Sequence, residues 1–179
     1  MTELTLVTPT MEYAHDILAL RQELLDAHDA DDFAGCSGLQ KFDRTEGWLA
    51  HLRRFSSEET CPEDRVPSDT YLAVRKSDNR IVGVIDLRRH IDHPILSVWG
   101  GHIGYSVRPG ERRKGYAKEM LRLGLEKYRA RGLRRVLITC DRDNPASERT
   151  ILANGGMFEK EVEADGERIR RFWIDLSHE

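Results

Sequence analysis

Apolar and polar positions repeat along the chain with two different periods, and these periods predict a mixed α/β fold. Apolar residues that recur every three or four positions indicate an amphipathic helix, and short apolar or alternating runs bounded by turn residues indicate a strand. The predicted elements are a strand at 4–7, a helix at 11–28, a helix that ends near residue 55, strands at 70–74, 81–87 and 99–107, a helix at 114–130, a strand at 135–140, a short helix from 145, and a hairpin at 158–164 and 168–174. This order is typical of an α/β sandwich and differs from a doubly wound sheet.

Turn residues give the ends of these elements. Residues 29–40 and 56–69 are rich in polar, glycine or proline residues and are expected to be loops. Asn144 precedes Pro145, a preferred first residue of a helix, so we expect Asn144 to cap the short helix. Asp165-Gly166 predicts the tight turn of the last hairpin.

Length and composition favour a single soluble domain over residues 1–179. Hydrophobic residues make up 39% of the chain and charged residues 33%, which argues against a disordered protein. The formal net charge is −3, whereas nucleic-acid-binding domains usually carry a basic excess, so nucleic acid is not an expected partner. No apolar stretch approaches the length of a membrane span, so a membrane is not expected either.

Cysteine and histidine spacing suggests neither disulfides nor a metal site. Cys36, Cys61 and Cys140 are widely spaced and form no CxxC pair. His90 and His93 form an HxxH pair beside an aspartate, but no third ligand follows at a metal-site spacing, so we expect a polar loop and no metal. With no recognisable signal peptide at the N-terminus, a cytoplasmic location is expected.

The candidate chemistry is concentrated in the basic turn between the strand that ends at Val107 and the next helix. The first amides of a helix have no partner within it and lie at the positive end of its dipole, so they can bind an anion such as a pyrophosphate. Arg112, Arg113 and Lys114 add positive charge there, and Gly115 leaves the backbone open to phosphates. A solvated basic helix start is the alternative interpretation.

Two common phosphate motifs do not fit this turn. Gly110 and Gly115 have the GxxxxG spacing of a Walker A loop but lack its Lys and its Ser or Thr, and no GxGxxG follows a strand. The segment Arg112-Arg113-Lys114-Gly115-Tyr116-Ala117 instead resembles the Q/R-x-x-G-x-G/A signature of the GNAT acetyltransferase superfamily.

Three neighbouring segments are similar to the same family. Residues 103–109 resemble its fourth strand, residues 143–147 its N-x-x-A/S segment, and residues 154–158 its G-F end, while the residues after the signature resemble its central helix. The resemblance covers residues 70–176 clearly. It implies the GNAT fold, a central mixed and mostly antiparallel sheet flanked by helices, and transfer of an acetyl group from acetyl-CoA to an amine.

The resemblance also implies where acetyl-CoA would bind. The strand that carries Tyr105 and Val107 would splay from residues 135–140, and the free backbone groups of Tyr105 and Val107 would pair with the pantetheine arm. The Val107 amide would also hold the thioester carbonyl, as in an oxyanion hole. Asn144, which follows the strand at 135–140, would contact the pantetheine arm near that strand. The pyrophosphate would lie on the backbone amides of Arg112, Arg113, Lys114, Gly115, Tyr116 and Ala117.

The catalytic residues are less clearly indicated. His102 is the first candidate for the general base, because it lies where many GNAT relatives have a glutamate and because the imidazole pKa is near neutrality. A purely structural histidine and a water chain are the alternatives, since strand alternation turns His102 away from Tyr105 and Val107 unless a bulge intervenes. Leu152 replaces the tyrosine that protonates the thiolate in many relatives, which leaves Ser147 or water as the acid.

The acceptor is not identified by the sequence. We expect a primary amine on a small molecule or peptide, and the acidic segment 26–32 either attracts a cationic acceptor or is a solvated loop. Relatives commonly pair their C-terminal edge strands, so a homodimer is considered. Two other functions remain open: a non-catalytic acyl-CoA-binding regulatory module, which Leu152 motivates, and a nucleic-acid-binding domain that uses Arg168-Ile169-Arg170-Arg171, which the net charge disfavours.

Overall fold

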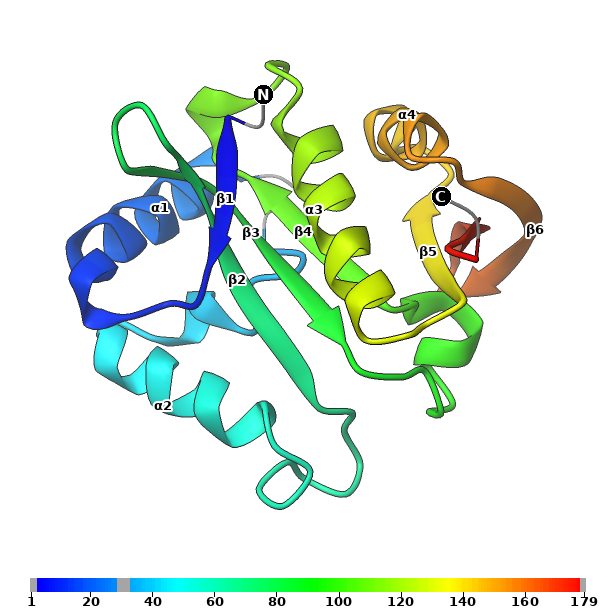
Figure 1. The fold of residues 1–179 in the computed structure, drawn as a ribbon, viewed down its shortest axis with the longest axis horizontal. Helices are drawn as coiled ribbons and strands as arrows, with labels where there is room; N and C mark the ends of the chain where they lie inside the picture. The colour runs from blue at the N-terminus through cyan, green and yellow to red at the C-terminus, as the bar shows by residue number, and fades with distance from the viewer. Residues whose placement is uncertain (1–2, 29–32, 178–179) are drawn as a thin grey trace.

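The computed structural model describes residues 3–28 and 33–177, and its elements follow the predicted order (Figure 1). The elements are β1 (Leu4–Val7), α1 (Ala14–Ala27), α2 (Thr45–Phe55), β2 (Ser68–Arg75), β3 (Arg80–Arg88), β4 (Ile103–Val107), α3 (Tyr116–Ala130), β5 (Arg135–Asp141), α4 (Pro145–Ala153), β6 (Met157–Ala164) and β7 (Glu167–Asp175). The hydrophobic periods therefore predict the type and order of these elements correctly.

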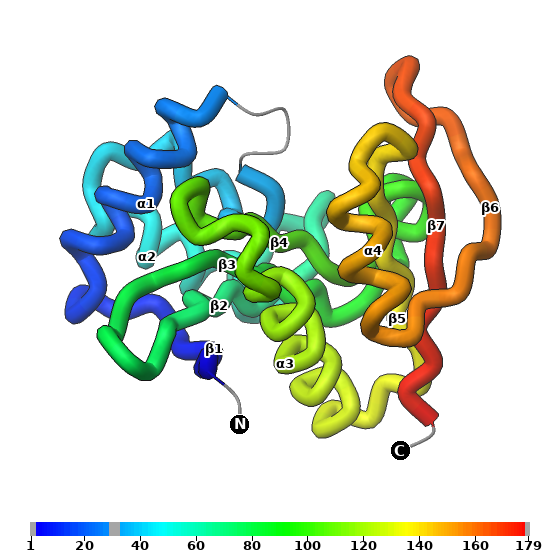
Figure 2. Tube along the Cα trace, turned by 90° about the horizontal axis from the view of Figure 1, so that it is seen from above, coloured from blue at the N-terminus to red at the C-terminus, as the bar shows by residue number. Residues whose placement is uncertain are grey.

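The strands form two antiparallel sheets. The first has the order β1-β2-β3-β4 and the second the order β5-β7-β6. Helices α1 and α2 pack on one face of the first sheet, and α3 packs on the other (Figure 1). Seen from above, the second sheet and α4 lie on the opposite side of the molecule from α1 and α2 (Figure 2). The arrangement is the mixed α/β sandwich that the sequence predicts.

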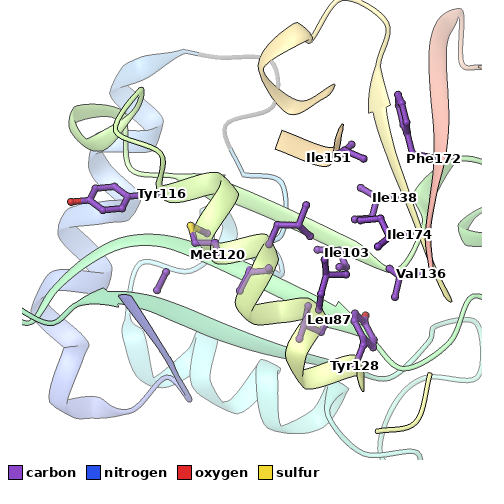
Figure 3. Close-up of a cluster of buried hydrophobic side chains, with 14 of the residues drawn as sticks. Leu87, Ile103, Tyr116, Met120, Tyr128, Val136, Ile138, Ile151, Phe172 and Ile174 are labelled. Carbon is purple, nitrogen blue, oxygen red and sulfur yellow. The ribbon is translucent and has the colours of Figure 1, made fainter. Parts of the chain in front are cut away.

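One buried cluster joins the two sheets under α3. Met120 and Tyr128 of α3 pack with Leu87 of β3, Val136 of β5 and Phe172 of β7 (Figure 3). The apolar face of α3 thus contacts both sheets, and burial of such side chains contributes about 1.5–3 kcal/mol each to folding. The helix start and the adjoining edges of β4 and β5 are held in place by this cluster.

The predicted strand at 99–107 is wrong at its start. Residues Leu96–Gly100 form a π-type turn, and β4 begins at Ile103. Side chains from distant strands satisfy the carbonyls of this turn: Arg171 donates to Ser97 and Val98 oxygens, and Thr139 to the Trp99 oxygen. These long-range hydrogen bonds replace the ladder that a strand would need, and the local alternation of residue types does not reveal them.

Candidate functional site

Within residues 3–28 and 33–177, the edges of β4 and β5 that face each other have no strand partner beyond His102. In an antiparallel pair, alternate residues bond to the neighbour and the others point outward. Arg88 donates to the His102 carbonyl and Arg108 donates to the Val82 carbonyl, with β3 and β4 in unbroken register between these bonds. The amides and carbonyls of Tyr105 and Val107 therefore point away from β3, towards β5.

The edge of β5 is oriented in the matching way. Leu176 donates to the Arg134 carbonyl and Arg142 donates to the Arg168 carbonyl, which turns the backbone groups of Leu137 and Thr139 away from β7. Leu137 meets His102, and after this contact β4 pairs only with β3 and β5 only with β7. The two strands separate here, so two backbone edges face each other with groups that no strand among the described residues pairs with.

His102 lies at the point where the strands separate. Its amide donates to the Leu137 carbonyl at 2.8 Å, and its ring Nδ1 accepts from the Leu137 amide at 2.9 Å. The residue is 6% exposed, and the edge of its ring packs against Tyr128 at a centroid distance of 5.8 Å. Burial lowers the pKa of His102 to about 4, so the imidazole is neutral at physiological pH.

The turn before α3 forms a cradle of free amides. Arg113 and Gly115 both adopt left-handed backbone angles, with φ of 62° and 84°, and this delays the helix from the predicted residue 114 to Tyr116. Within residues 3–28 and 33–177, the amides from Arg113 to Ala117 have no acceptor. No atom of the described residues beyond its chain neighbours would lie within 4 Å of a Cβ added at Gly115, so these residues leave this side of the backbone open. Such a concave set of amides at a helix start fits a pyrophosphate.

The side chains of the turn divide into two groups. Arg112 and Arg113 are exposed, and the Arg112 guanidinium donates to the Val107 carbonyl at 3.3 Å. Lys114 instead donates to Glu111 at 2.8 Å. Tyr116 is buried and points away from the other labelled side chains of the cluster (Figure 3). Its hydroxyl accepts from Arg75 at 3.1 Å. Tyr116 and Lys114 can therefore contribute backbone amides, while Arg112 and Arg113 can also contribute charge.

Arg108, which no sequence motif marks, fixes the position of this turn. Its side chain is 3% exposed and forms ion pairs with Asp16 at 2.7 Å and Glu23 at 2.6 Å, both on α1. It also donates to the Ile81 carbonyl. An arginine beside Pro109 gives no local signal for this role, because its two ion-pair partners are more than eighty residues away in the sequence.

Helix α4 brings Ser147 to Tyr105. The Asn144 side chain accepts from the Ser147 amide at 3.1 Å, which confirms the predicted cap. The hydroxyls of Ser147 and Tyr105 lie 2.9 Å apart, so they connect α4 with the outward edge of β4. Burial raises the pKa of Tyr105 to about 12, which keeps it a protonated phenol. Leu152 is 48% exposed and does not replace the missing tyrosine.

Asp86 of β3 is a second buried polar residue, and no sequence motif marks it as one. Asp86 accepts from Thr70 at 2.9 Å and from Ser37 at 3.5 Å, and the two hydroxyls lie 2.8 Å apart. Burial raises the pKa of Asp86. Asp86 pairs with Gly104 of β4, directly beneath the segment that contains Gly35, and its burial gives no room for a substrate.

The remaining candidates do not form a site. His93 accepts from the Ile95 amide and its other nitrogen lies 3.0 Å from the Asp64 carbonyl, while His90 accepts from the Asp92 amide. Among the described residues, no group of three or more His, Cys, Asp or Glu side chains is placed to hold a metal, and no helix is long and apolar enough to cross a membrane. Of the acidic segment 26–32, residues 29–32 lie outside the described residues.

Known proteins provide an independent comparison. Residues 39–155 match the family described as acetyltransferase (GNAT) family. The ribosomal L7/L12 alpha-N-protein acetyltransferase RimL in complex with coenzyme A is 20% identical, with a TM-score of 0.69 over 99% of this chain and 96% of that chain. The microcin C7 self-immunity acetyltransferase MccE in complex with acetyl-CoA and AMP is 19% identical, with a TM-score of 0.68 over 98% and 94%.

A third similar structure is a chimera of the spermidine N-acetyltransferase SpeG from Vibrio cholerae and hSSAT. It is 15% identical, with a TM-score of 0.63 over 98% of this chain and 96% of that chain. At these identities the likeness establishes a shared fold, which confirms the predicted architecture. No curated protein matches the sequence.

Proposed function

Because the chain belongs to the GNAT family of acetyltransferases, we propose that it transfers the acetyl group of acetyl-CoA to a primary amine. The observation that carries this proposal is that the amide cradle and the outward edge of β4 follow one another in space. The cradle of free amides from Arg113 to Ala117 lies at the end of β4, and the outward edge of β4 leads from there to His102. A phosphate group and an extended arm would find partners in that order.

Acetyl-CoA is the expected substrate of this path. The amides of residues 113–117 would bind its pyrophosphate, with Arg112 and Arg113 supplying charge. The backbone groups of Tyr105 and Val107 would pair with the amide groups of the pantetheine arm, as an added strand does. The Val107 amide would hold the thioester carbonyl and stabilise the oxyanion that forms on attack. Asn144 holds the α4 start beside this arm.

Transfer requires proton movements at nitrogen and at sulfur. The ammonium loses one proton before attack, and the nitrogen loses a second after it bonds to the thioester carbon. The carbon–sulfur bond breaks, and the sulfur leaves as a thiolate that is stabilised and takes up one proton, so one proton is released overall. We propose that the Ser147 hydroxyl, which Tyr105 contacts at 2.9 Å, stabilises the leaving thiolate. The proton of the ammonium leaves through His102 or through water, and the hydrogen bonds of His102 decide between these routes.

The acceptor is proposed only as a class. The similar structures include enzymes named for spermidine and for a ribosomal protein, so both small amines and protein N-termini are compatible with this fold. We also propose a cytoplasmic location, where acetyl-CoA is available. A homodimer would use β6, an edge strand on which Met157 is 73% exposed, and sedimentation at micromolar concentration would reveal its mass.

A non-catalytic acyl-CoA-binding module is the second candidate, and the exposed Leu152 in place of a thiolate acid favours it. The experiment that separates the two measures release of free thiol from acetyl-CoA in the presence of polyamines, aminoglycosides, amino acids and peptides with free N-termini. Thiol release that depends on one amine class supports the enzyme. Binding of acetyl-CoA without thiol release across the whole panel would replace the proposal with the module.

A further inference from the structure

We infer that His102 is a positioning residue that sets where β4 and β5 separate, and that the amine loses its proton to water. The inference rests on the proposed acetyl transfer and deepens it, since it changes the role of the residue predicted to be the base. The observation behind it is that one residue, His102, occupies both backbone groups of Leu137, one with its amide and one with its ring.

The ring replaces a backbone acceptor. In a continuing β-ladder the Leu137 amide would donate to a carbonyl of the neighbouring strand. Here the nearby carbonyls of Gly100 and Gly101 accept from the Arg88 guanidinium at 3.2 and 3.0 Å instead. The Leu137 amide donates to Nδ1 of His102 at 2.9 Å. A side chain, which is longer than a peptide group, therefore forms the last link between the strands.

The backbone before His102 is shaped for this contact. Gly101 has a φ of 67°, and a Cβ at this position would lie 2.8 Å from the Leu137 carbonyl oxygen. Only glycine combines this backbone angle with such a close approach. The chain is thus brought against β5 at Gly101, and the next residue inserts its ring.

Three elements hold His102 in place. Its carbonyl accepts from the Arg88 amide of β3 and from the Tyr128 hydroxyl of α3, at 2.9 and 3.0 Å. Its ring packs edge-on against Tyr128 and is almost fully buried. Rotation of the ring would leave the buried Leu137 amide without an acceptor, which is unfavourable because a buried donor then loses its hydrogen bond.

This arrangement leaves no nitrogen to accept a proton from an amine. Because Nδ1 accepts a hydrogen bond, the proton of the neutral ring lies on Nε2, and Nε2 then has no free lone pair. The charged and titratable groups that face the ring are Tyr128 of α3, Arg88 of β3, and His90 and Asp92 of the loop that follows β3. Burial opposes protonation most strongly, Arg88 and His90 also oppose it, and Asp92 favours it. His102 would take up a proton only by breaking its bond to Leu137.

The position of β4 at His102 affects the geometry of acetyl transfer. The separation of β4 from β5 begins at His102, three residues before Tyr105 and five before Val107. A small rotation of β4 about this point would move the Val107 amide away from the thioester carbonyl. Misplacement of about 1 Å can reduce an enzymatic rate by about a hundredfold.

Two variants that cannot act as bases test the inference. In His102→Asn the side-chain oxygen takes the place of Nδ1 and can accept from Leu137, whereas in His102→Gln the amide lies one methylene further away. We expect His102→Asn to keep kcat within about threefold of the wild type, because loss of a general base typically costs about 10²–10⁴ in rate. We expect His102→Gln to raise the KM for acetyl-CoA and to lower the melting temperature.

The pH profile gives a readout that a stability change alone would not move. If His102 only positions β4, the dependence of kcat/KM on pH is the same in His102→Asn and in the wild type. A loss of turnover of a hundredfold or more in His102→Asn, with an unchanged KM for acetyl-CoA and an unchanged melting temperature, would show that His102 is the base and overturn the inference. Equal behaviour of the Asn and Gln variants in turnover, KM and melting would also overturn it.

Failure of the proposed function gives a different result. If the wild type releases no thiol with any amine, acetyl transfer is wrong, but the melting temperatures of the two variants still report the link to Leu137. A His102→Asn variant that melts near the wild type, and above His102→Gln, then supports the positioning role alone. The reverse order contradicts it.

Discussion

At the scale of single residues, the contact between Ser147 and Tyr105 determines how the thiolate can be stabilised. The two hydroxyls lie 2.9 Å apart, and either can be the donor. Tyr105 has a raised pKa of about 12, so it keeps its proton throughout the physiological range. When Tyr105 donates to Ser147, the Ser147 proton is free to point towards the leaving sulfur. Tyr105 therefore orients the hydroxyl that we assign to stabilise the thiolate.

We expect Ser147→Ala to lower kcat about tenfold to a hundredfold while the KM for acetyl-CoA changes little, because the hydroxyl acts on charge that develops in the transition state. Tyr105→Phe should lower kcat by a smaller factor. The double variant should be no slower than Ser147→Ala, since Tyr105 acts through Ser147. Steady-state kinetics of the three variants measures this coupling. Strictly additive effects would show that the two residues act independently.

His102 should also make stability depend on pH. Burial lowers its pKa to about 4 in the folded state, from the ordinary value of 6.5 that it has in the unfolded chain, so between these values the unfolded state binds more protons. Stability is therefore lost as the pH falls from about 6.5 to 4, by about 3 kcal/mol for this group. Urea unfolding of the wild type and His102→Asn at a series of pH values tests this. Parallel stability curves for the two proteins across this window would contradict the assignment.

At the scale of elements, the turn between β4 and α3 is held by α1 through Arg108. The guanidinium is almost completely buried and bridges Asp16 and Glu23, while its third contact is the Ile81 carbonyl of β3. A buried charge that loses its partner is strongly unfavourable, so this group couples the position of the amide cradle to the packing of α1.

We expect Arg108→Ala to lower the free energy of unfolding by about 1.5–3 kcal/mol, because it removes the charge-assisted hydrogen bonds to Asp16 and Glu23 and the hydrogen bond to the Ile81 carbonyl. Arg80→Ala is the matched control. Arg80 also approaches Glu23, but at 3.8 Å and with a side chain 44% exposed, so its removal should cost less than about 1 kcal/mol. Chemical denaturation of both variants measures the difference. Similar losses of unfolding free energy for the two variants would show that the buried Arg108 stabilises the fold no more than the exposed Arg80 does.

The sequence predicts elements better than contacts, and the reason is distance along the chain. The cap at Asn144 and the phosphate turn at Gly115 depend on neighbouring residues, and both follow from local rules. The bond between His102 and Leu137 joins residues 35 apart, and Arg108 and Asp16 are 92 apart. Local sequence rules do not predict the start of β4 for the same reason, because Arg171 and Thr139 stabilise the turn before it. Only the folded structure shows these partners.

At the scale of the whole molecule, the path proposed for acetyl-CoA lies between the two sheets. One wall is the edge of β4 with the α3 start, and the other is the edge of β5 with the start of α4. Because α3 packs against both sheets, a ligand that contacts both walls binds the folded state and not the unfolded chain. Binding should therefore stabilise the protein as a whole.

The most direct test of acetyl-CoA binding at the α3 start is thermal unfolding of the wild type, Gly115→Glu and Gly132→Glu with and without acetyl-CoA. Gly132, just beyond the other end of α3, has a similar φ of 81° and similar open space, so Gly132→Glu reproduces the backbone strain without altering the cradle. At a hundred times its Kd, acetyl-CoA should add about 2.7 kcal/mol, which corresponds to roughly 5–10 °C. We predict this shift in the wild type and in Gly132→Glu, and its loss in Gly115→Glu. No shift in the wild type, or an equal shift in all three proteins, would contradict the proposed site.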